Sequence, residues 1–561
     1  MVNEASMSLA SAPVTSCAAG PTLGATLSTF ALAVSLALVG GCTPEEPGDA
    51  SSATDTVGSA TEEGSGGSWH GEETTTEGST GEELVCEPGS MRCSVDGLAA
   101  EICAEDGLGY GVEVCSAEEI CVQGACLGPC DLVKDEPSSA GCAFTTQASA
   151  DNDEEPDGLM VTNISDVPAS VQLLAMPRGT HDEEAVGDAV ILAAGEGHLF
   201  ELPGEAVLEH SAYFTGGSFR VVSDHPVVAH QQAPLESPSS SDSGLLLPDH
   251  ALGLEYIVAS YPAVHEPSYF TVVALEDKTR LRWTPPADSA GSGLPIPFVP
   301  AGETGELTML RGDTVRIGAS ALMQDDPLLR DLSGTLVWAD KPIAVVGSSR
   351  CAQVPAGEPL CSHLYEPMLP VQAWGQRYIG GPAPSWQEGA GRWRIYAGVD
   401  GVKVEVDTVD EQPPLVLAER GDWVELDVGG AAVSFTGDGP FLPVYYLQSA
   451  GEAGGLGDPS MVQAAPVEQY LSRYAFSTGV DAEAHFVQVT RRVGGAPVMI
   501  DDALIDSFEV AVGGYEIAEV SVEAGAHIAS SDEEFGLQSL GYAGGSSYAH
   551  LAGVGLAALP E

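Results

Sequence analysis

Cysteine is the residue whose number and spacing point most directly to chemistry in this chain. Twelve cysteines occur, and ten of them follow Cys42 as an even set. These ten are Cys86, Cys93, Cys103, Cys115, Cys121, Cys126, Cys130 and Cys142, followed by Cys351 and Cys361. In an exported chain such a set predicts disulfide bonds. We predict that Cys351 pairs with Cys361 across a turn-prone loop, whereas the six cysteines of 86–126 allow 15 connectivities.

A zinc site is the alternative for the closely spaced Cys121, Cys126 and Cys130. No CxxC pair occurs, and no histidine lies between Cys86 and Cys142. The spacing therefore favours a small module held together by disulfides, because so few residues cannot bury a core of their own.

Cys42 has a different setting from the other cysteines. It ends an apolar run that begins at Leu27, is too short for a comfortable transmembrane helix and closes with small residues. Val39-Gly40-Gly41-Cys42 resembles the lipobox of bacterial lipoproteins, in which the cysteine becomes the acylated N-terminus. The usual basic n-region is missing, since no Lys or Arg precedes Arg92. An ordinary cleaved signal with an incidental cysteine is the alternative.

Several short motifs could indicate catalysis or metal binding, but none is complete. There is no Gly-x-Ser-x-Gly elbow, His-Glu-x-x-His motif or phosphate loop. Ser223-Asp224-His225 has the residue types of a triad, but neighbours on a strand point to opposite faces. The acidic run 151–158 lacks the distal glutamate of an EF-hand, so we interpret it as a solvated linker. We therefore expect no catalytic residue, no metal and no cofactor.

Two Arg-Gly-Asp triplets, at 311–313 and 420–422, suggest adhesion. Each precedes an alternating strand-like run, and the equivalent positions elsewhere hold Gly195-Glu-Gly197 and Gly513-Gly514. The shared feature is a glycine turn that opens a strand, so we predict a structural role for both triplets.

The charge of the chain restricts its partners. Twenty Lys and Arg stand against 82 Asp and Glu, for a formal net charge of −62 over 561 residues. Such a surface repels phosphate backbones, so binding to nucleic acid is excluded. The stretch 43–85 contains acids, Ser, Thr and Gly but no Lys or Arg, which is typical of an extended tether.

An internal repeat organises the rest of the chain. Leu247-Pro248 precedes Tyr256 by the same spacing that separates Leu369-Pro370 from Tyr378, and 465–474 is a weaker copy. Asp-x-Pro elements at 224–226, 340–342 and 438–440 recur between them. We expect these elements to be turns in which Asp accepts from its own downstream amide. Alternating strands in units of about 80–125 residues predict an all-β fold of tandem β-sandwiches.

The predicted organisation follows from these patterns. It comprises a lipoprotein signal peptide (1–41), an acidic tether (42–85), a disulfide module (86–130), an acidic connector (131–156) and four β repeats (157–265, 266–390, 391–480 and 481–561).

The stretch 340–379 carries the most specific motif, with Cys351, Cys361, Leu369-Pro370 and Trp374-Gly375 in order. It resembles the N-terminal domain family of the IgG Fc-binding protein, and Gly141-Cys142-Ala-Phe144 is similar to the opening of that family. The resemblance covers about 131–555. It implies an extracellular interaction role without catalytic residues or cofactor. The mucin-type and von Willebrand-type modules of the animal proteins are missing, so IgG binding is not carried over.

These observations predict an exported lipoprotein, attached to the bacterial outer membrane through Cys42 and acting in adhesion or macromolecule binding at the cell surface. The expected partner is an extracellular protein or glycan. Trp374, Trp386 and Trp393 are candidates for an aromatic contact surface, with burial in the core as the alternative. A structural envelope spacer without a specific ligand and a secreted hydrolase are the alternative functions.

Overall fold

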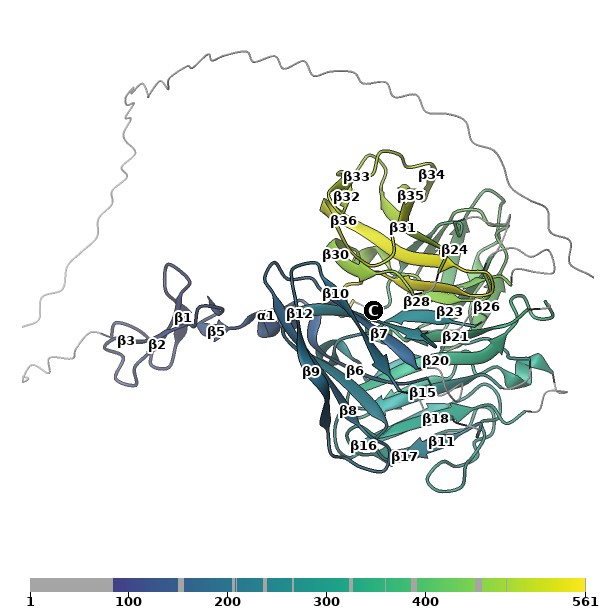
Figure 1. The fold of residues 1–561 in the computed structure, drawn as a ribbon, viewed down its shortest axis with the longest axis horizontal. Coiled ribbons are helices and arrows are strands. Elements are labelled where there is room, and N and C mark those ends of the chain that lie inside the picture. Colours follow the sequence, from purple (N-terminus) through teal and green to yellow (C-terminus); the bar gives the residue numbers. More distant parts are fainter. Residues whose placement is uncertain are drawn as a thin grey trace, which may run out of the picture. The chain divides into compact units, whose positions relative to one another are not determined.

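A computed structural model describes residues 84–149, 156–203, 207, 209–235, 240–264, 267–321, 326–358, 360–384, 391–449, 457–480 and 482–559. The predicted signal peptide, Cys42 and nearly all of the tether lie outside the described residues. Antiparallel strands make up most of the regular structure in the described part (Figure 1), and the predicted all-β class is confirmed. No helix in these ranges is long and apolar enough to cross a bilayer.

The cysteine-rich module consists of short strands with little buried apolar surface. Its strands are β1 (Met91–Cys93), β2 (Ala99–Cys103), β3 (Tyr110–Val114), β4 (Ile120–Val122) and β5 (Ala125–Leu127). Only Ala99, Ala100 and Cys103 are buried apolar residues here. Covalent cross-links therefore replace a hydrophobic core in this module. Helix α1 (Pro129–Asp135) follows it.

Repeat 2 shows the architecture most clearly, because its eight strands form two separate sheets. Its strands are β14 (Glu255–Ile257), β15 (Tyr269–Ala274), β16 (Thr279–Thr284), β17 (Gly305–Met309), β18 (Thr314–Gly318), β19 (Leu336–Ala339), β20 (Ile343–Ala352) and β21 (Ser362–Pro367). One sheet has the order β14-β19-β16-β17, and the other contains β18-β15-β20-β21 with β11 (Ala212–Phe214) at its edge. In β16, Leu281 and Trp283 are buried while Arg280 and Arg282 are exposed, as expected for a strand with one face in the core.

Repeat 3 has the same strand order in its two sheets, β22-β27-β24-β25 and β26-β23-β28-β29. Its strands are β22 (Arg377–Gly380), β23 (Gly391–Ala397), β24 (Lys403–Asp407), β25 (Leu415–Val416), β26 (Trp423–Leu426), β27 (Val433–Gly437), β28 (Phe441–Leu447) and β29 (Met461–Gln463).

Repeats 1 and 4 keep this topology, but one long strand replaces two short ones. The strands of repeat 1 are β6 (Gly141–Gln147), β7 (Asp157–Asn163), β8 (Ala169–Met176), β9 (Glu184–Leu192), β10 (Gly197–Leu202), β12 (Ser218–Ala233) and β13 (Asp242–Leu245), whereas β11, which lies between β10 and β12 in the chain, pairs with β18 of repeat 2. Those of repeat 4 are β30 (Leu471–Ser477), β31 (Ala484–Arg492), β32 (Val498–Ile500), β33 (Ala503–Leu504), β34 (Val510–Val512), β35 (Tyr515–Val522), β36 (Ala526–Tyr542) and β37 (Ser547–Leu551). The first half of β12 pairs with β6 and its second half with β13, so this strand passes from one sheet to the other.

Strand pairing moves every repeat boundary upstream of its predicted place. The repeats begin at β6, β14, β22 and β30, whereas the sequence placed these strands in the acidic connector or at the end of the preceding repeat. The correction has a simple cause. Each opening strand joins a sheet of the strands that follow it, and this pairing over a long sequence distance leaves no local signal.

The repeated tyrosine ties each linker to the next sandwich. The Tyr256 hydroxyl accepts from the Gly253 amide (2.7 Å) and donates to the Ile343 carbonyl (2.8 Å). The Tyr378 and Tyr474 hydroxyls accept from the equivalent amides, those of Gly375 (2.8 Å) and Leu471 (2.9 Å). The spacing recognised in the sequence therefore preserves a buried hydrogen bond.

The last strands of the four repeats meet one another. Strand β13 contacts β21 and β37, and β29 contacts the same two. Asp242 on β13 accepts hydrogen bonds from the amides of Tyr365 (3.1 Å) in repeat 2 and Met461 (3.0 Å) in repeat 3, and from the Ser460 hydroxyl. Burial raises the pKa of Asp242 to about 8, against the opposing effect of these bonds.

The end of repeat 4 pairs with the start of repeat 1, so the contacts among the repeats form a closed ring. The Ser139 amide donates to Val554 (2.8 Å), and the Leu556 amide donates to Pro137 (2.7 Å). These backbone bonds join segments more than 400 residues apart in the chain.

Two buried histidines fill the interface between repeats 1 and 4. The rings of His230 and His550 lie 4.4 Å apart between centroids. The Nε2 of His230 donates to the Leu551 carbonyl (3.1 Å), and that of His550 donates to the Ser477 carbonyl (3.0 Å). Burial lowers the pKa of both rings, that of His230 to about 4.

We expect the stability difference between the wild type and His230→Gln to shrink in acid. An unfolded histidine takes up a proton below pH 6.5, whereas folded His230 stays neutral until about pH 4. The neutral His230 ring therefore makes its full contribution to the free energy of unfolding above pH 6.5, and this contribution declines as the pH falls toward 4. At pH 4.5 the difference in free energy of unfolding should be about 2.5 kcal/mol smaller than at pH 7.5. Urea unfolding of both proteins at each pH measures it, and a difference independent of pH would contradict the assignment.

Candidate binding site between repeats 2 and 3

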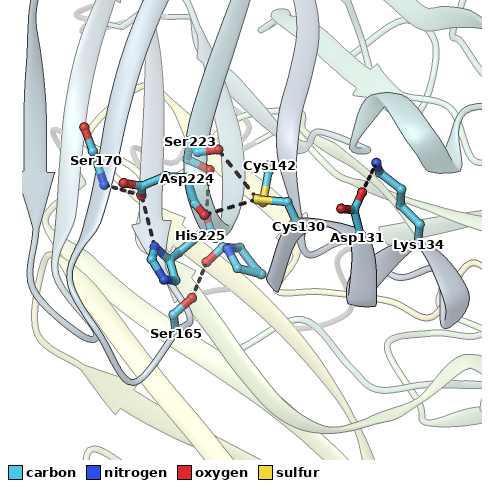
Figure 2. The surroundings of a disulfide bond; sticks show 10 residues. Cys130, Asp131, Lys134, Cys142, Ser165, Ser170, Ser223, Asp224 and His225 are labelled. Carbon is cyan, nitrogen blue, oxygen red and sulfur yellow. Dashed lines mark hydrogen bonds and ion pairs between the residues drawn. A yellow bond between two sulfur atoms is a disulfide. The ribbon is translucent and has the colours of Figure 1, made fainter. Parts of the chain in front are cut away.

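Five disulfides join the ten cysteines of the described chain. The pairs are Cys86–Cys103, Cys93–Cys121, Cys115–Cys126, Cys130–Cys142 and Cys351–Cys361. These cysteines are therefore not thiolate ligands for zinc. In Figure 2 the Cys130–Cys142 bond fixes helix α1 to β6 beside β12, with Cys130 Sγ 3.3 Å from the Asp224 carbonyl oxygen.

Ser223, Asp224 and His225 lie next to this disulfide but do not form a triad. His225 Nδ1 is 3.1 Å from Asp224 Oδ1, whereas the Ser223 hydroxyl donates to the His225 carbonyl oxygen at 2.6 Å (Figure 2). The serine proton is thus directed away from the imidazole.

The Asp-x-Pro elements are structural in a way that differs from the prediction. Asp224 Oδ1 accepts from the Ser170 amide (2.7 Å), and Asp340 Oδ1 accepts from the Arg280 amide (2.8 Å). Asp438 makes the same bond to Lys403 (2.8 Å). Each aspartate therefore accepts from the start of a strand more than 30 residues away, and not from its own downstream amide.

Both Arg-Gly-Asp triplets form tight turns in which glycine is required. Gly312 and Gly421 have φ angles of +78° and +88°, and the equivalent Gly195 and Gly513 also have positive φ. A Cβ on Gly312 would lie 2.2 Å from Met176 Sδ. Buried Asp313 accepts from the amides of Leu310 (2.7 Å) and Gly216 (3.1 Å). The Asp313 carboxylate therefore stabilises the fold through internal hydrogen bonds.

The arginine of each triplet reaches across to the preceding repeat. Arg311 Nη2 lies 2.8 Å from Glu183 of repeat 1, and Arg420 Nη2 lies 2.7 Å from Glu255 of repeat 2. The amides of both arginines donate to equivalent aspartates, Asp277 (3.1 Å) and Asp400 (2.8 Å). The triplets therefore connect successive repeats.

We expect Asp313→Ala to lower the free energy of unfolding by about 2–4 kcal/mol, because the buried Gly216 amide, the partly buried Leu310 amide and the Tyr213 hydroxyl lose their acceptor. Asp422→Ala is the matched variant in the other triplet, where the carboxylate accepts from the exposed amides of Ala418 and Glu419. Its effect should be about 1 kcal/mol or less. Thermal and urea unfolding compare the two, and equal effects would show that burial of Asp313 does not matter.

A cavity of about 530 Å³ opens beside the second triplet, at the junction of repeats 2 and 3. Its size is within the range of ligand sites in proteins. Its apolar wall includes Leu254, Val371, Trp374, Val399, Pro440 and Leu559. Its polar side chains are Glu255, Gln372, Asp400 and Arg420. An apolar wall with a few charged groups is typical of a site that binds a side chain or small molecule.

The equivalent place between repeats 1 and 2 is nearly filled. It holds a cavity of only about 100 Å³, which Arg220 and Asp249 line together with Arg311. Arg220 Nε lies 3.0 Å from Asp249 Oδ2, so this ion pair occupies the space. Val371 stands at the start of the 3₁₀ turn at 371–373, as Asp249 does at 249–251. The exchange of Asp for Val leaves the second junction open.

A rigid contact between the same two repeats supports the cavity. Arg394 of β23 is buried, and its Nη1 donates to Asp331 Oδ2 (2.9 Å) and to the Ser260 carbonyl (3.0 Å) in repeat 2. Its guanidinium stacks on the rings of Tyr261 and Trp423, 4.0 Å from each centroid. This buried cluster therefore links the two repeats whose junction forms the cavity.

A model of the family described as IgGFc binding protein matches residues 242–541, more than half of the chain. The chain belongs to this family. The human IgGFc-binding protein is 27% identical over 223 residues, which cover 39% of this chain and 4% of the human protein. The chain therefore spans a small fraction of the length of that relative.

The match to the IgGFc binding protein family runs from the first residue of β13 into β36. It includes repeats 2 and 3 completely. Of the residues that line the 530 Å³ cavity, it includes all those named above except Leu559. The predicted extent of 131–555 is longer, since it also includes repeat 1.

The two tryptophans that the structure describes are buried in the core and do not form an exposed aromatic surface, although Trp374 contributes to the wall of the cavity. Trp374 and Trp393 are each 2% exposed. Trp374 donates its indole hydrogen to the Leu369 carbonyl (3.1 Å), and Trp393 packs on Phe435 and Tyr445. Large rings bury more apolar area in the core than at the surface. Trp386 lies outside the described residues.

Sequence reasoning missed the other residues of the cavity. Glu255, Gln372 and Asp400 lie in three separate segments, and no spacing connects them. The second Arg-Gly-Asp triplet was the one available signal, because Arg420 contacts both carboxylates. In the described part of the chain, no three His, Cys, Asp or Glu side chains are placed to hold a metal ion.

Proposed function

We propose that this chain is an exported protein that binds an extracellular macromolecule through the surfaces of its four repeats, without catalysis. Membership of the IgGFc binding protein family over residues 242–541 is the observation that carries the proposal. Five disulfides support it, because such bonds persist in oxidising, extracellular surroundings.

The charge of the chain favours a protein partner with basic patches. A net charge of −62 attracts cationic surfaces and accelerates their association, and it repels polyanions. The human relative is named for binding the Fc part of IgG, so Fc is a rational probe. This chain corresponds to a small part of that relative, and its own partner is to be found by experiment.

Membrane attachment through Cys42 is the second part of the proposal. The apolar run ending in Val39-Gly40-Gly41-Cys42 and the acidic stretch after it support an acylated N-terminus with a spacer. The repeats would then be displayed away from a bacterial outer membrane.

We expect Cys42→Ala to release the protein from the membrane fraction or to leave it unprocessed. Several acyl chains give stable attachment, which an unmodified N-terminus lacks. Fractionation and intact-mass measurement of the full chain in a Gram-negative host compare the variant with the wild type. Cys17→Ala is the control and should fractionate like the wild type. Identical fractionation and mass of Cys42→Ala and wild type would contradict the anchor.

Binding is tested with the purified full chain against immobilised Fc, extracellular proteins and envelope polysaccharides, alongside esterase, protease and glycosidase assays. Saturable binding to a basic protein that weakens at high salt supports the proposal. Reproducible turnover that one His or acid substitution removes would favour a hydrolase instead. The absence of both binding and turnover would favour a structural spacer.

A further inference from the structure

The cavity between repeats 2 and 3 has more negative than positive charge. It is lined by two carboxylates, Glu255 and Asp400, and by one cation, Arg420. Arg420 is engaged in part: its Nη2 binds Glu255 Oε2 and its amide binds Asp400 Oδ1, whereas its buried Nε has no hydrogen-bond partner among the described residues. Within the described chain the second oxygen of each carboxylate accepts no hydrogen bond. The cavity therefore offers two acceptor oxygens and a net negative charge, beside the Arg420 Nε donor and the Gln372 amide.

The apolar wall of the cavity suits the aliphatic part of a long side chain. Val371, Val399 and Pro440 present branched and ring carbons beside the carboxylates. Lysine and arginine place their methylene stems on apolar surface and keep the charged head on polar groups. A volume of about 530 Å³ admits such a side chain with adjoining backbone.

We propose that this cavity binds a lysine or arginine side chain of a partner protein, with its head group at Glu255 and Asp400. This inference deepens the proposed function and rests on it, since it assigns the contact by which a basic protein is recognised. The net charge of −62 directs such a partner to the chain, and the cavity supplies a specific contact. The first junction lacks this capacity, because the Arg220–Asp249 pair fills it.

The direct test titrates the full chain with Nα-acetyl-lysinamide and follows binding by calorimetry. Nα-acetyl-norleucinamide, which has the stem without the charge, and glucose are the comparison ligands. We expect the lysine derivative to bind at least about tenfold more tightly than either, a difference of one opposite-charge contact. Equal binding of norleucinamide would show that the cavity selects apolar ligands, and tighter binding of glucose would show a sugar site; both overturn the proposal.

Two matched aspartates supply the control variants. Asp400 and Asp277 both accept from the amide of a triplet arginine, but only Asp400 lines the large cavity. Asn retains the side-chain oxygen for that amide and removes the charge. We expect Asp400→Asn to weaken the lysine derivative about tenfold and Asp277→Asn to leave its affinity unchanged. Equal effects of the two substitutions would overturn the proposal.

The variant Val399→Trp distinguishes a failure of the cavity inference from a failure of the proposed function. We expect the larger ring to narrow the cavity beside Asp400 and to leave the Arg420–Glu255 ion pair in place, and an unchanged melting temperature verifies the fold. If the wild type binds a basic protein and Val399→Trp does not, the inference is supported. If both bind it equally, the macromolecular function stands and the inference fails. If neither binds a macromolecule although the wild type binds the lysine derivative, the proposed function fails while the cavity's selectivity stands.

Discussion

Replacing Arg394 by methionine is expected to lower the free energy of unfolding by about 3–5 kcal/mol. Methionine keeps the length of the side chain but leaves the carboxylate of Asp331, itself 3% exposed, without its cation. It also removes hydrogen bonds to Ser260 and Ser333 and the stacking on Tyr261. A buried charge deprived of its partner is among the most destabilising changes in a protein.

Arg282→Met is the matched control for this prediction. Arg282 also pairs with a carboxylate, Glu306 at 2.6 Å, but both side chains are nearly half exposed. Exposed ion pairs contribute about 0–1 kcal/mol, so the control should unfold almost like the wild type. Urea unfolding followed by tryptophan fluorescence and circular dichroism compares the two. Similar losses in both variants would show that the Arg394 cluster does not hold repeats 2 and 3 together.

Removing the carboxylate of Asp242 is expected to have a comparable effect at the meeting point of the repeats. In Asp242→Ala the buried amides of Tyr365 and Met461 and the Ser460 hydroxyl lose their acceptor. Each buried donor left unpaired costs about 1–3 kcal/mol, so we expect a loss of about 3–9 kcal/mol for the three donors. Because these donors belong to repeats 2 and 3, hydrogen exchange should increase in β21 and β29 as well as in β13.

Asp131→Ala is the control for Asp242→Ala, since Asp131 forms an exposed pair with Lys134. It should leave both stability and hydrogen exchange near the wild-type values. Faster exchange confined to β13 in Asp242→Ala would contradict the role of Asp242 in joining three repeats.

Local patterns were enough to predict the all-β class and the existence of the repeats. Alternation such as Leu281 and Trp283 between Arg280 and Arg282 depends only on neighbouring residues, because successive side chains on a strand face opposite ways. The glycine turns of the Arg-Gly-Asp triplets are local in the same sense, since a positive φ is a property of one residue. Interpreting those triplets as structural turns agrees with the geometry observed at Gly312 and Gly421.

The pairing of strands that lie far apart in the chain could not be predicted from local patterns. The strand opening repeat 2, β14, pairs with β19, about 80 residues downstream, and nothing around Tyr256 identifies that partner. The predicted boundaries therefore fell after the opening strands. The acceptor role of Asp340 was missed for the same reason, because its donor, the Arg280 amide, lies 60 residues away.

The sequence by itself determined the strand composition, the repeat spacing, the acidic charge and the even set of cysteines, since each of these is a property of composition or of residues close in the chain. Only the tertiary structure decided how the four repeats close into a ring, which cysteines pair in 86–142, and that Trp374 and Trp393 are buried. The cavity beside Arg420 also exists only in three dimensions, because Glu255, Val371 and Asp400 come together only when two sandwiches pack. Packing between repeats depends on contacts over a hundred residues, and no local pattern encodes them.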